Sequence, residues 1–511
     1  MILVAVLAIP ALGALVAAAI PARADRAARL AGTLFAAAGF LASLALYLVP
    51  GRRTAVVVDT MLGVAVPAIR PWHELDVAWA PGLDLRFHLG VDGISYPLVV
   101  LTTLLTLLCC GYTLWRVPEP GRGRLLVALL LVIEVGILGV FLALDLVLFF
   151  VFFEVVLLPM YAVIAVWGGP DRRHAARKFV LYTLFGSVLL LVGVFAVVAA
   201  AGTSDLVALT ASNGGATAGL TRGTQFAAFV LLAVAFAVKS PLWPLHTWLP
   251  DAHTEAPTVG SVILAGVLLK MGTYGLIRIA VGVLPDAAAR AAPVLGVLAV
   301  AAIIVGSLVC LAQTELKRLI AYSSVGHMGF VLLGIATVNA TGIQAALIGN
   351  IAHGIITGLL FFLAGAIKDR AHTGELADLG GLRERAPALA GILGFAAIAS
   401  LGLPGLAGFW GEAFAVVAAV RNEGPLWTVL AVLAAVGGAL TAAYFLRLLR
   451  RVTHGPASPV VAGMPGRLHA AELVAWAPLV VLALVVGLVP ALVVGVAEPS
   501  VSALFTEVVV R

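Results

Sequence analysis

Seven titratable side chains lie near the middle of long apolar stretches, or directly after a break in one, where lipid rather than water is the expected surrounding. They are Glu134, Glu154, Lys239, Lys270, His327, His353 and Glu412. A charged side chain at the centre of a bilayer costs about 2.5–3.5 kcal/mol even on lenient insertion scales. Groups of this kind on separate stretches, at roughly one depth, indicate a functional row that runs parallel to the membrane plane.

The chemistry that suits such a row is proton transfer. Burial disfavours the charged form of a lysine or a glutamate, and an opposite charge nearby restores it. Glu154 is the candidate partner of Lys239, and a pair of this kind releases a proton when its members separate. Histidine titrates nearest neutrality and suits a relay between them. A single buried histidine is more often a hydrogen-bonded core residue, but the aligned set favours a conduction path.

The composition of the chain requires a membrane. Of its 511 residues, 62% are hydrophobic and 11% are charged, whereas soluble domains have roughly 45–50% apolar and about 25% charged residues. A soluble enzyme, a disordered chain and a fibrous protein are therefore excluded. The net charge of +6 needs no nucleic-acid partner, because the loops account for it.

Apolar runs long enough to cross a bilayer, about 20 residues each, predict an all-α polytopic protein with fourteen transmembrane helices. The runs are 2–20, 28–50, 94–115, 124–144, 147–167, 178–201, 226–249, 258–284, 291–311, 319–337, 341–367, 387–420, 426–449 and 471–496. The first run has no charged segment before it and no small-residue cleavage site, so it is interpreted as a span rather than a signal peptide.

Lysines and arginines gather in the loops on one side, which the positive-inside rule assigns to the cytoplasm. Both termini are then expected on the outer, periplasmic side. The long outer loop carries Arg52, Arg53, Arg70 and Arg86. Two alternating runs in that loop, Leu75–Trp79 and Leu83–Leu89, flank Pro81-Gly82 and predict a small β-hairpin.

Two predicted spans are interrupted. The seventh contains Lys239-Ser240-Pro241 followed by Pro244, and the twelfth contains Leu403-Pro404-Gly405. Proline removes a backbone donor and clashes with the preceding turn, so each helix should break. The breaks lie five spans apart, which predicts two inverted five-helix repeats, 124–284 and 291–450, flanked by 1–123 and 451–511. Paired broken helices point to a transport site; the alternative is that the prolines are harmless kinks.

Few other residues suggest chemistry. The cysteines Cys109, Cys110 and Cys310 form no metal-binding pattern, and no phosphate-binding or dinucleotide-binding glycine motif occurs. We therefore expect no metal, no cofactor, no redox centre and no NADH site in this chain. The cluster of His246, Asp251, His253 and Glu255 fits a proton entrance or an end-of-helix network equally well. Lys317-Arg318 fits a topology anchor better than a site.

Three long motifs resemble the antiporter-like subunits of respiratory complex I. They are KSPLWPLHTWLPDAHTEAPTVGSVILAGVLLKMGTYG from Lys239, QTELKRLIAYSSVGHMGFVLLG from Gln313, and IAHGIITGLLFFLAGAI at 351–367. The likeness covers spans 4–13 closely and the ends loosely. It implies a proton-pumping channel that contains no redox centre.

The resemblance also implies roles for single residues. Glu154 and Lys239 match the family's charge-switching pair, Lys270 matches its central lysine, and His327 and His353 match its two histidines. The last group of the row is glutamate in M-type members and lysine in the L and N types, so Glu412 favours the M type. Gly326 departs from the serine that usually precedes the first histidine, which puts a water-positioning hydroxyl in doubt.

The expected function is therefore that of a proton-translocating subunit in the membrane arm of NADH:quinone oxidoreductase, with L-type and N-type chains as neighbours. Lipid, water and protons are its other expected partners, and a bacterial inner membrane its location. A subunit of a multisubunit sodium/proton antiporter and the membrane arm of a hydrogenase complex are the alternatives that share the core motifs. A purely structural scaffold is the alternative from another class.

Overall fold

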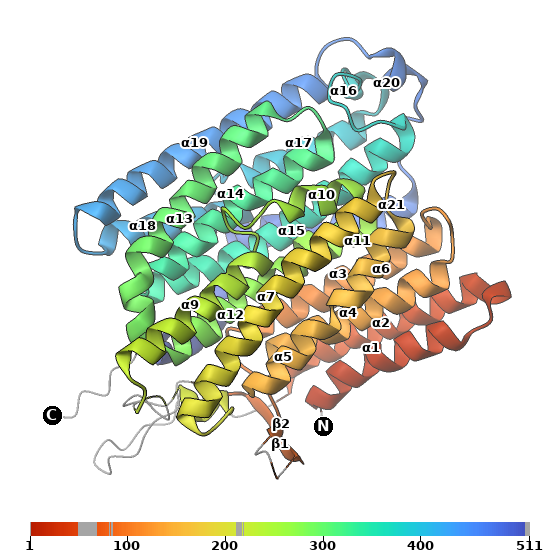
Figure 1. The fold of residues 1–511 in the computed structure, drawn as a ribbon. Coiled ribbons are helices and arrows are strands. Elements are labelled where there is room, and N and C mark those ends of the chain that lie inside the picture. The colour runs from red at the N-terminus through yellow and green to blue at the C-terminus, as the bar shows by residue number, and fades with distance from the viewer. Residues whose placement is uncertain are drawn as a thin grey trace.

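A computed structural model describes residues 2–49, 69–80, 82, 85–210, 217 and 219–505 of the chain. The helices lie side by side in one slab, with α1 (Ile2–Ala19) and α2 (Asp25–Leu48) at one end and α19 (Pro425–Thr453) at the other (Figure 1). Thirteen helices in the described residues are long and apolar enough to cross a membrane. The predicted all-α, polytopic membrane fold is confirmed.

The remaining helices are α3 (Tyr96–Trp115), α4 (Gly123–Leu142), α5 (Leu146–Val155), α6 (Leu157–Trp167), α7 (Arg172–Ala201), α8 (Leu206–Leu209), α9 (Arg222–Lys239), α10 (Trp248–Glu255), α11 (Thr258–Ile263), α12 (Leu269–Gly275), α13 (Pro285–Ala312), α14 (Leu316–Ala336), α15 (Ala340–Ala371), α16 (Leu382–Arg385), α17 (Pro387–Ser400), α18 (Ala407–Arg421), α20 (Pro459–Gly463), α21 (Ala470–Leu488) and α22 (Ala491–Leu504). The long helices among them coincide broadly with the predicted runs, whereas the short helices α8, α16 and α20 lie outside these runs.

The most buried helices are the ones that carry the central titratable residues. The apolar window of Thr258–Val281 is 100% buried within the protein, and that of α15 is 94% buried. The corresponding share is 28% for the span that ends at Leu48 and 33% for α7, which therefore leave most of their surface for lipid or other chains. The fold thus surrounds Lys270, His327 and His353 with protein.

Both predicted helix breaks are present. Helix α9 ends at Lys239 and the chain resumes helical structure only at Trp248. Helix α17 ends at Ser400 and α18 begins at Ala407. Because the halves α17 and α18 have 14 and 15 residues, neither is long enough to count as a span alone. The count of fourteen spans, the inverted repeats and the four-part division of the chain stay predictions.

Three interruptions differ from the predicted continuous runs. The run 147–167 is divided at Val156, because Pro159 denies the carbonyl of Val155 its usual donor. The run 471–496 is divided after Leu488, where Pro490 starts a new helix. The run 258–284 holds two π-helical turns, Leu264–Leu268 and Leu276–Val281, on either side of α12. These π turns contain no proline, and the segment is buried on every side. Neither a helix-breaking residue nor hydrophobic periodicity therefore predicts them.

The outer loop forms the predicted β-hairpin from β1 (His73–Ala80) and β2 (Leu85–Val91), which pair antiparallel. Pro81 and Leu83 at its tip, like Arg52 and Arg53, lie outside the described residues. The hairpin projects beyond the ends of the helices, below α5 (Figure 1). The backbone oxygen of His88 accepts a hydrogen bond from the amide of Leu144, which ties the hairpin to the turn between α4 and α5.

His88 is buried between two acidic groups of different elements. Its Nε2 lies 2.9 Å from Glu74 Oε1 on β1, and its Nδ1 lies 3.3 Å from Asp205 Oδ1, just before α8. Burial opposes the charged ring, but the interactions with Asp205 and Glu74 outweigh it and raise the pKa of His88 above its ordinary 6.5. Asp76 adds to this effect from β1. When it is protonated, the ring pairs with acids of both elements and so holds the hairpin to the helix ends.

Gly349 on α15 and Gly411 on α18 allow those two helices to approach closely. A Cβ atom at Gly411 would lie 2.5 Å from Gly349 Cα, which is backbone and cannot rotate away. We expect Gly411→Ala to destabilise the chain by roughly 1–3 kcal/mol, because the helices must separate. Thermal unfolding of the purified protein measures this loss. Gly394→Ala on α17 meets nothing within 4 Å and is the matched control; equal melting temperatures for the two variants would contradict the prediction.

A raised histidine pKa stabilises the folded state below the unfolded value and loses that contribution as the pH rises through the folded value. The attachment of the hairpin should therefore loosen as the pH rises from 6.5 through the raised pKa of His88. Hydrogen exchange of the β2 amides, corrected for the intrinsic rate, should accelerate over this range. His88→Gln should remove the acceleration, while His73→Gln, whose ring contacts only the backbone oxygen of Leu46, should retain it. An identical pH profile for wild type and His88→Gln would refute the assignment.

Candidate functional site

Four of the seven predicted residues form one chain of contacts at the centre of the bundle. Lys270 Nζ lies 2.6 Å from His353 Nδ1, and His327 Nδ1 lies 3.0 Å from Glu412 Oε1. The rings of His353 and His327 connect these two pairs, with centroids 5.9 Å apart in an edge-to-face arrangement. The four side chains come from α12, α15, α14 and α18, so residues spread over more than 140 positions meet in one row.

The contact of Lys270 fixes where protons can reside. Its side chain is fully buried, and Nζ also donates to the backbone oxygen of Ala265 at 2.6 Å. Ala265 lies in the first π turn, five residues earlier. An ammonium group has no acceptor, so Nδ1 of His353 must accept and a neutral His353 carries its proton on Nε2. This Nε2 has no hydrogen-bond partner among the described residues.

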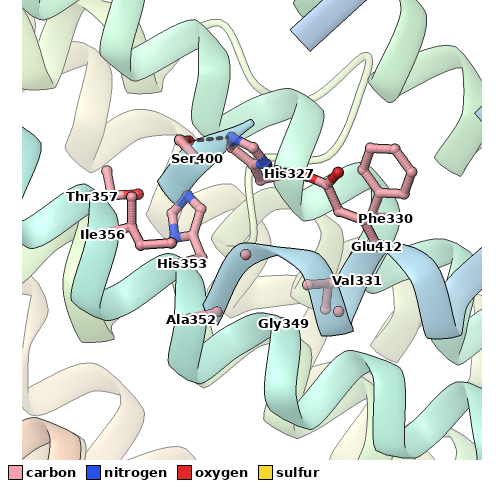
Figure 2. A pocket seen from close by; sticks show the side chains of 12 residues that line it. His327, Phe330, Val331, Gly349, Ala352, His353, Ile356, Thr357, Ser400 and Glu412 are labelled. Atoms are coloured by element: carbon pink, nitrogen blue, oxygen red, sulfur yellow. Dashed lines mark hydrogen bonds and ion pairs between the residues drawn. The ribbon is translucent and has the colours of Figure 1, made fainter. Parts of the chain in front are cut away.

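His327 is held at both ring nitrogens. Nδ1 faces the Glu412 carboxylate, and Nε2 lies 2.9 Å from Ser400 Oγ. Figure 2 shows Ser400 and Glu412 on opposite sides of the His327 ring, with His353 close by. Ser400 is the last residue of α17 and Glu412 lies in α18. Each half of the broken helix therefore supplies one hydrogen-bond partner of the His327 ring. With Glu412 ionised, Nδ1 donates to it and Ser400 donates to Nε2.

A small cavity joins these groups. His327, His353, Ser400 and Glu412 line a space of about 30 Å³ (Figure 2). A volume of 10–15 Å³ or more, with two or more polar partners, is enough for a water molecule. The polar groups required are the unpartnered Nε2 of His353, the Ser400 hydroxyl and the carboxylate. A water here would bridge the two histidine rings.

Lys239 lies apart from this chain, at the end of a helix that packs against α12. It ends α9, is 1% exposed, and its Nζ lies 4.6 Å from the centroid of the Phe153 ring. The neighbouring Ser240 packs against α12, because a Cβ at Gly272 would lie 2.2 Å from Ser240 Oγ. The break after Lys239 therefore touches the helical turn that follows Lys270.

The predicted partner Glu154 does not contact Lys239. Neither Lys239 Nζ nor Glu154 Oε1 has a hydrogen-bond partner among the described residues, although the charge of Glu154 acts on Lys239. The Lys239 ammonium lies instead over the aromatic ring of Phe153, the residue before Glu154. The structure thus holds the two in a separated arrangement, one of the two states that a switching pair requires.

Glu134 is the member that the row does not reach. It is fully buried in α4, and neither carboxylate oxygen has a hydrogen-bond partner among the described residues. The carboxylate faces α2, where a Cβ at Gly39 would lie 3.8 Å from Glu134 Oε1. Glu134 forms no hydrogen bond or ion pair with Lys239 or Lys270 in the described part of the chain, so the sequence pattern indicated its depth but not the direction in which it points.

The cluster around α10 divides between its two predicted roles. Asp251 pairs with Lys178 at 2.6 Å, and Glu255 accepts from the backbone of Asp171, as an end-of-helix network would. The ring of His253 is fully buried, has no hydrogen-bond partner among the described residues, and stacks on Phe361 of α15 at 4.4 Å. His253 therefore belongs to the buried groups inside the bundle and not to the end-of-helix network.

Sequence reasoning missed three polar residues of this region. Ser400 is described above, and its position next to the break at Leu403-Pro404-Gly405 is the signal that could have found it. Lys317, interpreted as a surface anchor, is only 5% exposed and donates to the backbone oxygen of Ala256 at 2.9 Å. It lines an opening of about 530 Å³. Arg278 forms a buried ion pair with both oxygens of Asp92 at 2.6 Å, which fixes the start of α3 against the second π turn.

No three histidine, cysteine or acidic side chains gather in the described part of the chain in a way that could hold a metal ion. The three cysteines are buried and separate from the row. The arrangement as a whole can accept, store and pass protons between a lysine, two imidazoles, a hydroxyl and a carboxylate.

Comparison with known proteins gives a consistent result. Residues 143–438 match the family model described as "NADH:quinone oxidoreductase/Mrp antiporter, TM". Subunit M of NADH-quinone oxidoreductase from Rhodobacter capsulatus is 44% identical over 84% of this chain and 83% of its own length. NAD(P)H-quinone oxidoreductase chain 4 1 from Synechococcus sp. (strain JA-3-3Ab) is 43% identical over 85% and 84%.

A solved structure extends the likeness to the whole chain. A chain of respiratory complex I from Thermus thermophilus with bound NADH superposes with a TM-score of 0.83 at 30% identity, over 99% of this chain and 100% of that one. The Mrp complex from Dietzia sp. DQ12-45-1b shares the fold, with a TM-score of 0.79 at 24% identity over 100% of this chain and 52% of that one. The chain therefore belongs to the NADH:quinone oxidoreductase/Mrp antiporter family of membrane subunits, among the relatives named subunit M and chain 4.

Proposed function

We propose that this chain is a proton-translocating subunit in the membrane arm of a bacterial NADH:quinone oxidoreductase. The observation that carries the proposal is the buried chain Lys270–His353–His327–Glu412, with 2.6 Å and 3.0 Å contacts at its two ends. A chain of this kind conducts protons and has no evident structural use, because well-packed apolar residues would stabilise a bundle at least as well as buried ionic groups do. Relatives named as subunits of that enzyme support the assignment.

The geometry suggests a sequence of proton transfers. The Lys270 ammonium gives a proton to His353 Nδ1, and the proton on His353 Nε2 leaves into the cavity. Ser400, through its hydroxyl, delivers a proton to His327 Nε2 and takes one from the cavity side in exchange. The proton on His327 Nδ1 passes to Glu412, which becomes neutral. Each step moves one proton between groups within hydrogen-bond reach directly or through one water.

Lys239 supplies the input side of this scheme. The residue after Lys239 packs against α12, the helix that carries Lys270, so approach of Glu154 to Lys239 would alter the charge that acts on α12. Closing and opening the Glu154–Lys239 pair would then alternate Lys270 between loading and releasing its proton. Glu134 has no step here, and it is retained as a site residue only by its burial and depth.

The energy source lies outside this chain. Its sequence offers no site for NADH, flavin, iron–sulfur clusters or another cofactor, so redox chemistry is assigned to other subunits, and L-type and N-type chains are the proposed membrane neighbours. The proposed location is a bacterial inner membrane with both termini on the periplasmic side. The Mrp complex and the archaeal sulfane sulfur reductase complex resemble this chain at 24% and 22% identity, which supports a shared fold alone.

Removal of either buried lysine tests the proposed function. Lys239→Ala and Lys270→Met should leave an assembled complex but lower proton pumping and coupled quinone turnover at least about tenfold, because general acid–base groups contribute roughly 10²–10⁴-fold. Pumping in proteoliposomes and NADH oxidation measure the two effects. Arg450→Ala, at an exposed position of α19, is the control. Full pumping by both lysine variants, in complexes of normal composition, would favour the scaffold alternative.

Removal of the Ser400 hydroxyl tests the relay to His327. One buried hydrogen bond contributes about 1 kcal/mol, so Ser400→Ala should slow pumping about fivefold. Ser400→Thr retains the hydroxyl and should restore most of the rate. Ser187→Ala removes another buried hydroxyl, one without a partner among the described residues, and should pump normally. Unchanged pumping by Ser400→Ala would exclude this hydroxyl from the path.

A further inference from the structure

An apolar groove at the edge of the bundle lies far from the titratable row in the fold. It is formed by α1, α4 and α6 and has a volume of about 430 Å³. Ala14, Leu15 and Ala18 form the wall on α1, and Leu129 and Val132 belong to the wall on α4. Helix α1 leaves most of its apolar window exposed, since only 39% of it is buried. The groove therefore opens toward the lipid side of α1.

The mouth of the groove is marked by Trp167 and Arg122, which both line it. The indole nitrogen of Trp167 donates to the backbone oxygen of Gly121 at 2.6 Å. Tryptophan is enriched where hydrocarbon meets the lipid headgroups; Trp167 is 4% exposed, and its N–H is directed at the backbone of the 116–123 connection. The residues of the 116–123 connection therefore lie at headgroup level, directly above an apolar wall.

Arg122 is placed at this level by an unusual backbone. It follows Gly121 in the left-handed region with φ of 58°, which costs a non-glycine residue free energy. Its side chain is exposed and has no hydrogen bond or ion pair with any described residue. An uncompensated cation in a strained conformation at the edge of an apolar groove points to a negatively charged occupant.

The surrounding charge supports the same conclusion. Residues 20–30 and 121–132 contain five arginines and one acid. That acid, Asp25, is already engaged by Arg29 Nε and by the backbone amide of Arg124, each at 2.8 Å. Arg124 in turn donates to the carbonyls of Ala18 and Ile20 at the end of α1. Arg23 and Arg26 are exposed, and neither pairs with a described residue. Glu119 lines the separate opening beside Lys317.

We propose that this groove binds an anionic phospholipid, with one acyl chain between α1 and α4 and its phosphate at Arg122, Arg23 and Arg26. Basic residues at the headgroup level of an apolar inter-helix groove provide the two features that such a lipid needs. The groove lies in the leaflet on the side of the 20–24 and 116–122 connections. This site is independent of the proton path, and the lipid would fix the end of α1 against α4 and α6.

The test uses the assembled complex in phosphatidylcholine nanodiscs that contain a trace of photoactivatable lipid. The probe is phosphatidylglycerol with a diazirine on one acyl chain, and phosphatidylcholine with the same chain is its neutral counterpart. Labelled peptides of α1, α4 and α6 are then quantified by mass spectrometry. Phosphatidylglycerol should label the groove at least about fivefold more than phosphatidylcholine, the selectivity expected for one basic residue at the membrane surface. Added salt should reduce the difference.

Two variants separate headgroup from chain. Arg122→Gln should reduce phosphatidylglycerol labelling toward that of phosphatidylcholine, and Ala18→Trp should fill the groove and suppress labelling by both lipids. Arg450→Gln, an exposed arginine on α19, should change nothing. The charge variant leaves helix packing untouched, so the proposal remains testable if Ala18→Trp does not assemble.

Two results would overturn the proposal. Equal labelling by the two lipids in the wild type would show an ordinary lipid-facing groove with no selectivity for charge. Protection of the groove from both lipids, together with cross-links from α1 to another subunit, would show that a protein covers it.

Discussion

The central constraint on this structure is the free energy of keeping ionisable groups away from water. A buried ammonium needs acceptors, and Lys270 finds two, the Ala265 carbonyl and His353 Nδ1. The π turn that contains Ala265 and the position of α15 both serve this requirement. His327 shows the same principle, because a carboxylate and a hydroxyl satisfy its two nitrogens. Of the seven predicted residues, Lys239, Glu154 (at Oε1), Glu134 and His353 (at Nε2) have polar atoms without a hydrogen-bond partner among the described residues, so these groups can take a new partner without losing one.

The broken helices explain how apolar spans can supply polar ligands. A continuous helix satisfies its own backbone and offers one side chain per turn to a given face. The break between α17 and α18 brings Ser400 and Glu412, which are twelve residues apart, to the two nitrogens of His327. The break after Lys239 places a lysine at a helix end, against the glycine face of α12. The first interruption begins with the buried residues 239–242, as hydrocarbon surroundings demand, whereas Leu403 and Pro404 of the second are exposed.

Much of this arrangement could be predicted from the sequence because the membrane limits the alternatives. Composition gave the fold class, the prolines gave both broken helices, and the cost of buried charge selected Lys270, His327, His353 and Glu412. Direction was beyond reach, since depth along a helix does not say which face a residue occupies, and Glu134 points to α2 instead of the row. Ser400 and Lys317 were missed because a serine in a span and a lysine at a helix end carry little free-energy cost in a membrane, so neither stands out in the sequence. The π turns lie in a segment that is buried on every side, so hydrophobic periodicity carries no signal of their change in phase.

The two π-helical turns around α12 also set the angular phase of Lys270. Each π turn accommodates one residue more than an α-turn would, and one residue corresponds to about 100° of rotation about the helix axis. Excising a single residue from Leu264–Leu268 would therefore swing everything on one side of it by more than a quarter turn relative to the other. Lys270 could then no longer face His353 on α15 while Ser261, which precedes the π turn, still donates to the backbone oxygen of His253. The π turn therefore sets the rotation of the helix so that residues on either side of it meet their separate partners at once.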